Sequence, residues 1–163
     1  MDAGAPQILI ALESSGLGLA IRQSVWAYPA ANVGHVVSLV LFAGCVAVLD
    51  LLLLGVIRVD GRAQFLARAR SWAMRAFLLV ALTGTVLFIA EASHVALNRV
   101  FQLKVALIVA ALLNATIFGA RAVAAAADLP ETAPMPAAVR AAAIASLSLW
   151  LGVVALGRFI AYV

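Results

Sequence analysis

Five titratable side chains interrupt a chain that is otherwise almost entirely apolar, and each falls near the same end of one of four long apolar segments. They are His35, Glu91, His94, Lys104 and Arg158. A charged or titratable group inside a lipid bilayer costs about 2.5 kcal/mol or more, so a group that persists there usually faces a bundle interior and serves a ligand or a pathway. Their common level on four segments therefore predicts one shared site.

The residue types at this level suit a haem. Two neutral imidazoles, those of His35 and His94, can occupy the two axial positions of a haem iron. Lys104 and Arg158 can pair with the haem propionates at the membrane edge, and Glu91 belongs to the same polar layer. The set predicts a cofactor site for haem b and a role in electron transfer, with His35 and His94 as the metal ligands.

The same residues leave other functions open. The imidazoles could bind copper, for which soft sulfur ligands are expected alongside, but Cys45 follows His35 by about 15 Å of helical rise. His35, Glu91 and Lys104 could also relay protons without a cofactor. The principal alternative is a non-catalytic membrane subunit or anchor of a redox complex. No nucleophile triad, phosphate loop or carboxylate pair is present, and the sequence leaves open whether the protein is an enzyme.

Each side chain also has a purely structural interpretation. His35 could hydrogen-bond a facing helix, and His94 could be solvated at a helix end. Lys104 and Arg158 could extend to lipid headgroups, as long basic side chains near helix ends commonly do. Glu91 could pair with a neighbouring basic residue. The occurrence of such groups on all four segments is what favours a shared site.

Composition predicts an all-α integral membrane protein. Of the 163 residues, 66% are hydrophobic and only 11% are charged, and the mean hydropathy is +1.14. This length accommodates about four spanning helices of roughly 20 residues, so residues 1–163 are predicted to form a single transmembrane four-helix bundle. The formal net charge of +4 reflects arginines near two connections, and nucleic-acid binding is not expected.

Apolar stretches and turn residues locate the helices. A short interfacial helix at about 5–24, broken near Gly16 and Gly18, is predicted to lie on the membrane surface. Spanning helices follow at about 29–57, 72–94, 100–127 and 137–162. The segment DLPETAPMP at 128–136 is a proline-rich turn through which no helix can continue, and we expect it to be the most mobile connection.

Basic residues set the expected orientation. Most of them flank the first and third connections, namely Arg58, Arg62, Arg68, Arg70, Arg75, Arg121 and Arg140. The positive-inside rule places both connections in the cytoplasm, and the N-terminus, the polar layer and the C-terminus on the opposite side. The prediction is a multi-pass protein of the bacterial inner (plasma) membrane with both termini in the periplasm.

Asp50 is the exception to the common level. It follows His35 by fifteen residues, roughly 22 Å along a helix, and so lies toward the cytoplasmic side. We expect an arginine of the neighbouring loop to pair with it. Gly44 and Gly84 are predicted to allow close approach between helices, as small residues do in membranes.

Four stretches of the chain carry a family resemblance. They read WAYPAANVGHVVSLVLFAGCVAVLDLLLLG, LTGTVLFIAEA, NRVFQLKVALIVAALLNA and WLGVVALGRFIAY. Together they resemble a family of uncharacterised four-helix bacterial membrane proteins over nearly the whole chain. The aligned positions are His35, Asp50 to Gly55, Thr83, Gly84, Asn98, Phe101, Lys104, Asn114, Gly157 and Arg158. His94 lies outside this pattern, and Leu52 stands where the family often has an arginine.

A more distant resemblance rests on two residues, the histidine of the first long helix and the lysine that opens the third. In this respect the chain is similar to the four-helix membrane protoporphyrinogen oxidases and to the membrane domain of copper-resistance D proteins. The resemblance to the oxidases implies haem b, with His35 as an axial ligand and Lys104 as a polar group near the tetrapyrrole. The expected partners are the lipid bilayer, a quinone or periplasmic redox partner, and other membrane subunits or a second copy of the chain.

Overall fold

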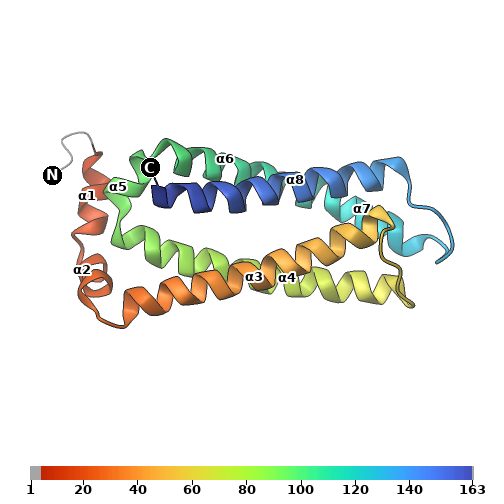
Figure 1. Ribbon diagram of the computed structural model, residues 1–163, viewed down its shortest axis with the longest axis horizontal. Helices are drawn as coiled ribbons and strands as arrows, with labels where there is room; N and C mark the ends of the chain where they lie inside the picture. The colour runs from red at the N-terminus through yellow and green to blue at the C-terminus, as the bar shows by residue number, and fades with distance from the viewer. Residues whose placement is uncertain (1–4, 163) are drawn as a thin grey trace.

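A computed structural model describes residues 5–162 of the protein, and every regular element in that range is a helix. Four helices in this range are long and apolar enough to cross a membrane: Ala27–Leu54, Arg62–Ala90, Arg99–Asp128 and Ala137–Phe159. They run side by side along the long axis of the molecule (Figure 1). The predicted all-α architecture with four long apolar helices is confirmed.

The first two long helices form an antiparallel hairpin. α3 (Ala27–Leu54) ends at Gly55, whose φ of +78° is the left-handed conformation that commonly closes a helix. α4 (Arg62–Ala90) begins after Gly61, at φ +66°, well ahead of the predicted residue 72. The added first turns read RAQFLARARS, and their alanine, leucine and arginine residues favour a helix without being apolar enough to appear as a span.

The third long helix is not uniform. α5 (Ala92–Leu97) and α6 (Arg99–Leu113) meet at Asn98, whose side-chain oxygen accepts from the amides of Val100 and Phe101. A π-helix, η1 (Asn114–Gly119), then connects α6 to α7 (Ala120–Asp128). The fourth helix, α8 (Ala137–Phe159), continues into a 3₁₀ turn at Ile160–Tyr162. The π-helix is a local widening that the sequence analysis did not predict.

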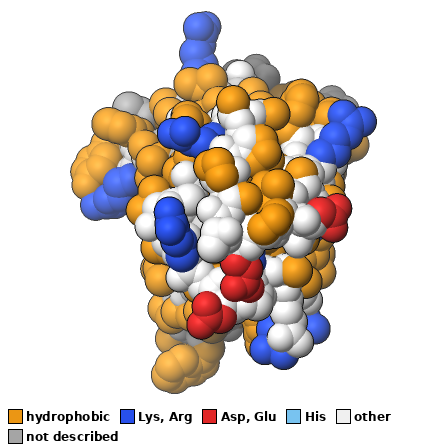
Figure 2. Space-filling view, turned by 90° about the vertical axis from the view of Figure 1, so that its right-hand side faces the viewer, with side chains coloured by type: hydrophobic (Ala, Val, Ile, Leu, Met, Phe, Trp, Pro, Cys, Tyr) orange, Lys and Arg blue, Asp and Glu red, His pale blue; other side chains and the backbone are white. Residues whose placement is uncertain are grey.

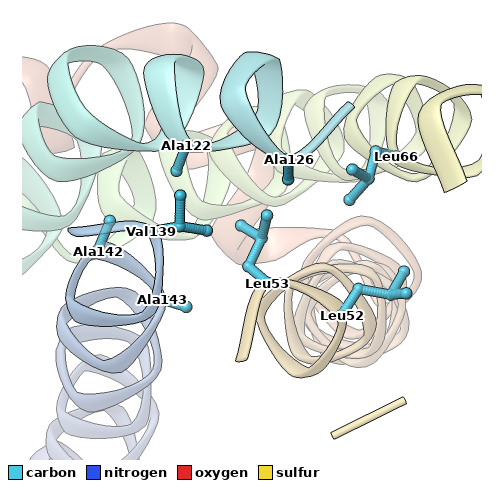
Figure 3. Close-up of a cluster of buried hydrophobic side chains, with 8 residues drawn as sticks. All are labelled: Leu52, Leu53, Leu66, Ala122, Ala126, Val139, Ala142 and Ala143. Carbon is cyan, nitrogen blue, oxygen red and sulfur yellow. The ribbon is translucent and has the colours of Figure 1, made fainter. Parts of the chain in front are cut away.

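Helix packing divides the bundle into two pairs. α3 packs along α4 and α6 packs along α8, while α8 also contacts α3 and α7 contacts α4. The main buried cluster lies where α3, α4, α7 and α8 converge (Figure 3), and comprises Leu52, Leu53, Leu66, Ala122, Ala126, Val139, Ala142 and Ala143. Four of its members are alanines, so the helix backbones approach closely at this level.

The loops 55–61 and 129–136 form one end of the bundle, called here the arginine end. Arg62 is buried, and its guanidinium donates to the carbonyls of Leu129 and Pro130 at 2.5 and 2.8 Å. The Glu131 carboxylate accepts from the Gly61 amide at 2.8 Å. Figure 2 faces this end and shows basic and acidic side chains among apolar ones. The proline-rich connection is thus hydrogen-bonded to the loop opposite.

Two short helices cover the opposite end, called here the terminal end. α1 (Gln7–Glu13) and α2 (Gly16–Gln23) lie across the bundle axis, α1 beside α5 and α2 beside α3 and α4 (Figure 1). The Glu13 carboxylate forms an ion pair with Arg22 at 2.7 Å and accepts hydrogen bonds from the Ser93 amide and hydroxyl. The predicted break near Gly16 is present, and the two helices are docked on the bundle by Glu13.

Candidate functional site

His35 is held in a defined orientation by a threonine of the neighbouring helix. Its Nδ1 lies 3.0 Å from the Thr83 hydroxyl oxygen. That hydroxyl is itself 2.7 Å from the Leu79 carbonyl, to which it donates its proton, so we assign its oxygen as the acceptor of Nδ1–H of the ring. A neutral imidazole with its proton on Nδ1 carries its lone pair on Nε2. The ring also lies within hydrogen-bonding range of the Val80 backbone, and it has no other hydrogen-bond partner among residues 5–162.

A glycine makes the room that this ring occupies. A Cβ atom at Gly84 would lie 3.1 Å from Cε1 of His35, closer than ordinary van der Waals contact. The close approach predicted at Gly84 is therefore present, and it serves the histidine. Gly44 has no atom within 4 Å of the corresponding Cβ position and is exposed, so the prediction that it brings two helices together is wrong.

Lys104 reaches across the second helix pair at the level of His35. Its Nζ lies 3.4 Å from the position that a Cβ at Gly157 would take, so this ammonium group lies against the backbone of α8. The side chain is half-buried, and its charge is near enough to act on the His35 ring. Among the residues that the structure describes, Lys104 forms no ion pair or hydrogen bond. The site thus contains a half-buried lysine amine without a partner in this range.

Glu91 occupies the junction between α4 and α5. Its carboxylate accepts a hydrogen bond from the Tyr28 hydroxyl at 3.0 Å. No ion pair joins it to Lys104 or to Arg99 within residues 5–162. Glu91 therefore connects α3 to the end of α4, at the edge of the layer that contains His35.

The other two predicted site residues point elsewhere. His94 is exposed on α5 and makes no hydrogen bond or ring contact with His35. Arg158 is exposed on α8, where its guanidinium donates to the Tyr162 hydroxyl and lies 4.7 Å above the centre of that ring. The structure therefore brings His35 and Lys104 together inside the bundle, and leaves His94 and Arg158 at its surface.

A second polar position, which the sequence analysis had set aside, lies deeper in the bundle. Asp50 is only 5% exposed, and its Oδ2 has no hydrogen-bond partner in the described part of the chain. No arginine there lies within ion-pair distance, so the expected loop arginine does not pair with it. A cavity of about 210 Å³ adjoins the carboxyl group and is also lined by Asn114, where the π-helix begins. An aspartate and an asparagine inside long apolar stretches were the available sequence signals.

Residues 5–162 contain no cluster of three or more metal-ligating side chains. No three His, Cys, Asp or Glu side chains in that range gather as a protein-only metal site requires. His35 presents an imidazole ring that is oriented by Thr83. That arrangement suits a metal that brings most of its own ligands, as the iron of a haem does.

Comparison with known proteins gives a family and no named relative. No similar protein was found among the curated proteins, and no similar solved structure was found. The likeness to protoporphyrinogen oxidases and copper-resistance D domains accordingly rests on His35 and Lys104 alone. Residues 13–163 match the Family of unknown function (DUF6644). The match spans nearly the whole described bundle, and the chain belongs to this family.

Proposed function

We propose that the protein is a multi-pass protein of the bacterial inner membrane that binds haem b near the periplasmic face and transfers electrons. Membrane insertion is supported by the four long apolar helices. It is supported also by their outward faces, which expose large apolar side chains such as Val40, Leu82 and Leu151 at 66%, 64% and 67%. Such continuous apolar surface is unfavourable in water and favourable in lipid.

The proposed orientation follows from the charges at the two ends. Arginines concentrate in and around the loops of the arginine end, which the positive-inside rule assigns to the cytoplasm. The terminal end, with α1, α2 and the C-terminal turn, then faces the periplasm. His35 and Lys104 belong to this half of the bundle, so the proposed haem site lies toward the periplasmic face.

One observation carries the haem proposal: the His35 imidazole, oriented by Thr83, and a lysine side chain without a partner among residues 5–162 occupy one level of the bundle. A haem needs an axial nitrogen for its iron and cations for its propionates. His35 would supply the first and Lys104 the second. Glycines adjoin both side chains, Gly84 beside the ring and Gly157 beside the ammonium group. His35 would be the one axial ligand that this chain supplies, because His94 is exposed on α5.

The residues around the site would have distinct roles. A bound haem would supply one-electron redox chemistry. Thr83 would fix the plane and the tautomer of the His35 ring, as outer-shell partners of metal-bound histidines do. Lys104 would compensate propionate charge in a medium of low dielectric constant. A quinone in the bilayer or a periplasmic protein is the proposed electron partner, and a second chain could provide another axial ligand.

A visible spectrum of the purified full-length protein tests the proposal. We expect a reduced-minus-oxidised haem band, its loss in His35→Ala and its weakening in Lys104→Met. His94→Ala is the matched control and should retain the band, since that ring is exposed. If the wild-type protein, isolated after expression with ample haem supply, shows no band, the haem proposal is wrong. A non-catalytic membrane subunit or a proton-linked transporter would then be the better interpretation.

A further inference from the structure

The cavity beside Asp50 is lined by all four long helices in the half of the bundle nearest the arginine end, and it is partly open at the bundle surface. Its volume is about 210 Å³, and most of its lining is apolar. At about 30 Å³ per water molecule, this space corresponds to roughly seven waters, or to a small organic molecule of about ten non-hydrogen atoms. Asp50 follows His35 by fifteen residues along α3, so the cavity is separate from the proposed haem site by about 22 Å of helical rise.

The cavity lining holds the Arg70 guanidinium as a donor, and its buried polar atoms on α3 and η1 are hydrogen-bond acceptors. Asp50 presents Oδ2, which is buried and has no partner among the described residues. Asn114 donates its amide nitrogen to the Ala142 carbonyl at 3.2 Å, which leaves its side-chain oxygen as an acceptor. The Ser146 hydroxyl lies within hydrogen-bonding range of the Asp50 carboxyl group. A ligand that matched these atoms would carry several N–H donors on one head group.

The remaining wall of the cavity is aromatic. The rings of Phe42 and Trp150 meet edge to face with centroids 4.6 Å apart, and Phe77 lies 5.5 Å from Phe42 and 6.2 Å from Trp150. All three side chains line the cavity. Aromatic faces attract cations and also pack against apolar groups. This wall complements the carboxylate, since both favour a positive head group joined to an apolar body.

The local backbone adds an independent indication of a site. The cavity lining includes Asn114, Ala115, Thr116 and Gly119, which belong to the π-helix. Single π-turns inside α-helices occur frequently at functional sites, because they re-aim side chains and loosen the regular ladder. Arg70 also lines the cavity but forms no ion pair with Asp50. The carboxyl group therefore keeps its acceptor capacity for a ligand.

We propose that this cavity is a binding site for a small hydrophobic amine, with the ammonium group on Asp50, Asn114 and Ser146 and the apolar body against Phe42, Phe77 and Trp150. The ammonium group supplies the donors that Oδ2 of Asp50 and the Asn114 oxygen lack. The apolar body would fill space beside an apolar wall, where water molecules are unfavourable because they lack hydrogen-bond partners. This inference does not depend on the haem proposal, because none of these residues belongs to the His35 layer.

A matched pair of probes tests the site in the full chain reconstituted in lipid nanodiscs. 2-Phenylethylamine and 2-phenylethanol have nearly the same shape and volume, and only the amine carries a positive charge. Equilibrium dialysis should show saturable amine binding that is at least tenfold tighter than alcohol binding. Equal affinity for the two probes would overturn the proposal, as would the absence of saturable amine binding at millimolar concentration.

Two variants locate the binding. Asp50→Asn should reduce amine affinity to the level of the alcohol, whereas Asp60→Asn, which removes an exposed loop carboxylate, should leave it unchanged. Ala115→Leu keeps every polar atom and fills cavity space, so it should lower amine affinity at least tenfold even if the Asp50 variant fails to fold. Unaltered binding in Ala115→Leu would place the amine elsewhere and overturn the proposal.

Discussion

Replacing Thr83 by valine tests whether the His35 ring is oriented by the neighbouring helix. Valine has almost the same shape and leaves Nδ1–H of the ring without the acceptor that lies 3.0 Å away. Thr85 provides the matched control, since its hydroxyl likewise donates to the carbonyl four residues earlier, at 2.8 Å, but faces outward. Thr83→Val and Thr85→Val therefore remove the same local bond and differ in the contact with His35.

The expected difference can be estimated from the surroundings of the bond. Leaving a buried donor unsatisfied costs about 1–3 kcal/mol in water-soluble proteins. Side-chain hydrogen bonds between helices in a membrane average nearer 0.6 kcal/mol, with a maximum of about 1.7. His35 is half-buried, so Thr83→Val should destabilise the protein by about 1 kcal/mol more than Thr85→Val. At about 2–4 °C per kcal/mol for a chain of this size, the midpoints should differ by a few degrees.

The assay is reversible unfolding in mixed detergent micelles, with each variant also made in a His35→Ala background. If the hydrogen bond is the cause, the excess effect of Thr83→Val should vanish once the ring is absent. Independent sites add to within about 0.5 kcal/mol. A cost for Thr83→Val that persists without His35, or that equals the cost of Thr85→Val, would refute the assigned orientation and tautomer of the ring.

Three further predictions concern the two ends of the bundle. Hydrogen bonds from the Ser93 hydroxyl and amide hold the pKa of the Glu13 carboxyl below its ordinary value, so the docking of α1 and α2 should be stable at neutral pH and weaken as the pH falls below about 4.5. The hydrogen-exchange protection factor of the Ser93 amide should report that loss, and Glu13→Gln should make this protection factor independent of pH in that window. Gly18→Ala should undock α1, raising protease sensitivity at the N-terminus, because its Cβ would lie against the Glu13 carbonyl. Arg62→Met should lower the unfolding midpoint by several degrees, since it leaves two carbonyls without their donor, while the exposed Arg68→Met should have little effect.

Much of the fold follows from composition and periodicity. Long apolar stretches separated by arginines, glycines and prolines are enough to predict four long helices. The second long helix begins at Arg62, ten residues before the predicted start at about residue 72. The prediction located the helix by its apolar residues, whereas the helix also includes the arginine-containing turns that precede them. The π-helix at 114–119 was also missed, since NATIFG contains no residue that prevents an ordinary α-turn. Only the tertiary setting of Asn114, hydrogen-bonded to α8, distinguishes this segment.

The sequence predicted the level of each candidate residue along its helix, but not the side of the helix on which its side chain lies. Spacing along each helix places His35 and Lys104 at one level, and the structure brings them together. The same spacing could not show that Arg158 folds back on Tyr162, or that α5 turns His94 outward, because both depend on the rotation of helix ends. Asp50 was assigned to a loop arginine on general grounds of charge pairing. The nearest loops instead use Arg62 and Glu131 to bind each other.

The π-helix also governs how the third long helix tolerates changes in its length. Each residue removed from an α-helix turns everything that follows by about 100° around the axis. A deletion in α6 or α7 would rotate Ala122 and Ala126 away from the core that they share with Leu53. Inside 114–119, by contrast, the wide turn can close into an ordinary α-turn and absorb the missing residue. Family members that are one residue shorter in this helix should therefore carry their gap at this segment, with an uninterrupted α-helix beside the cavity.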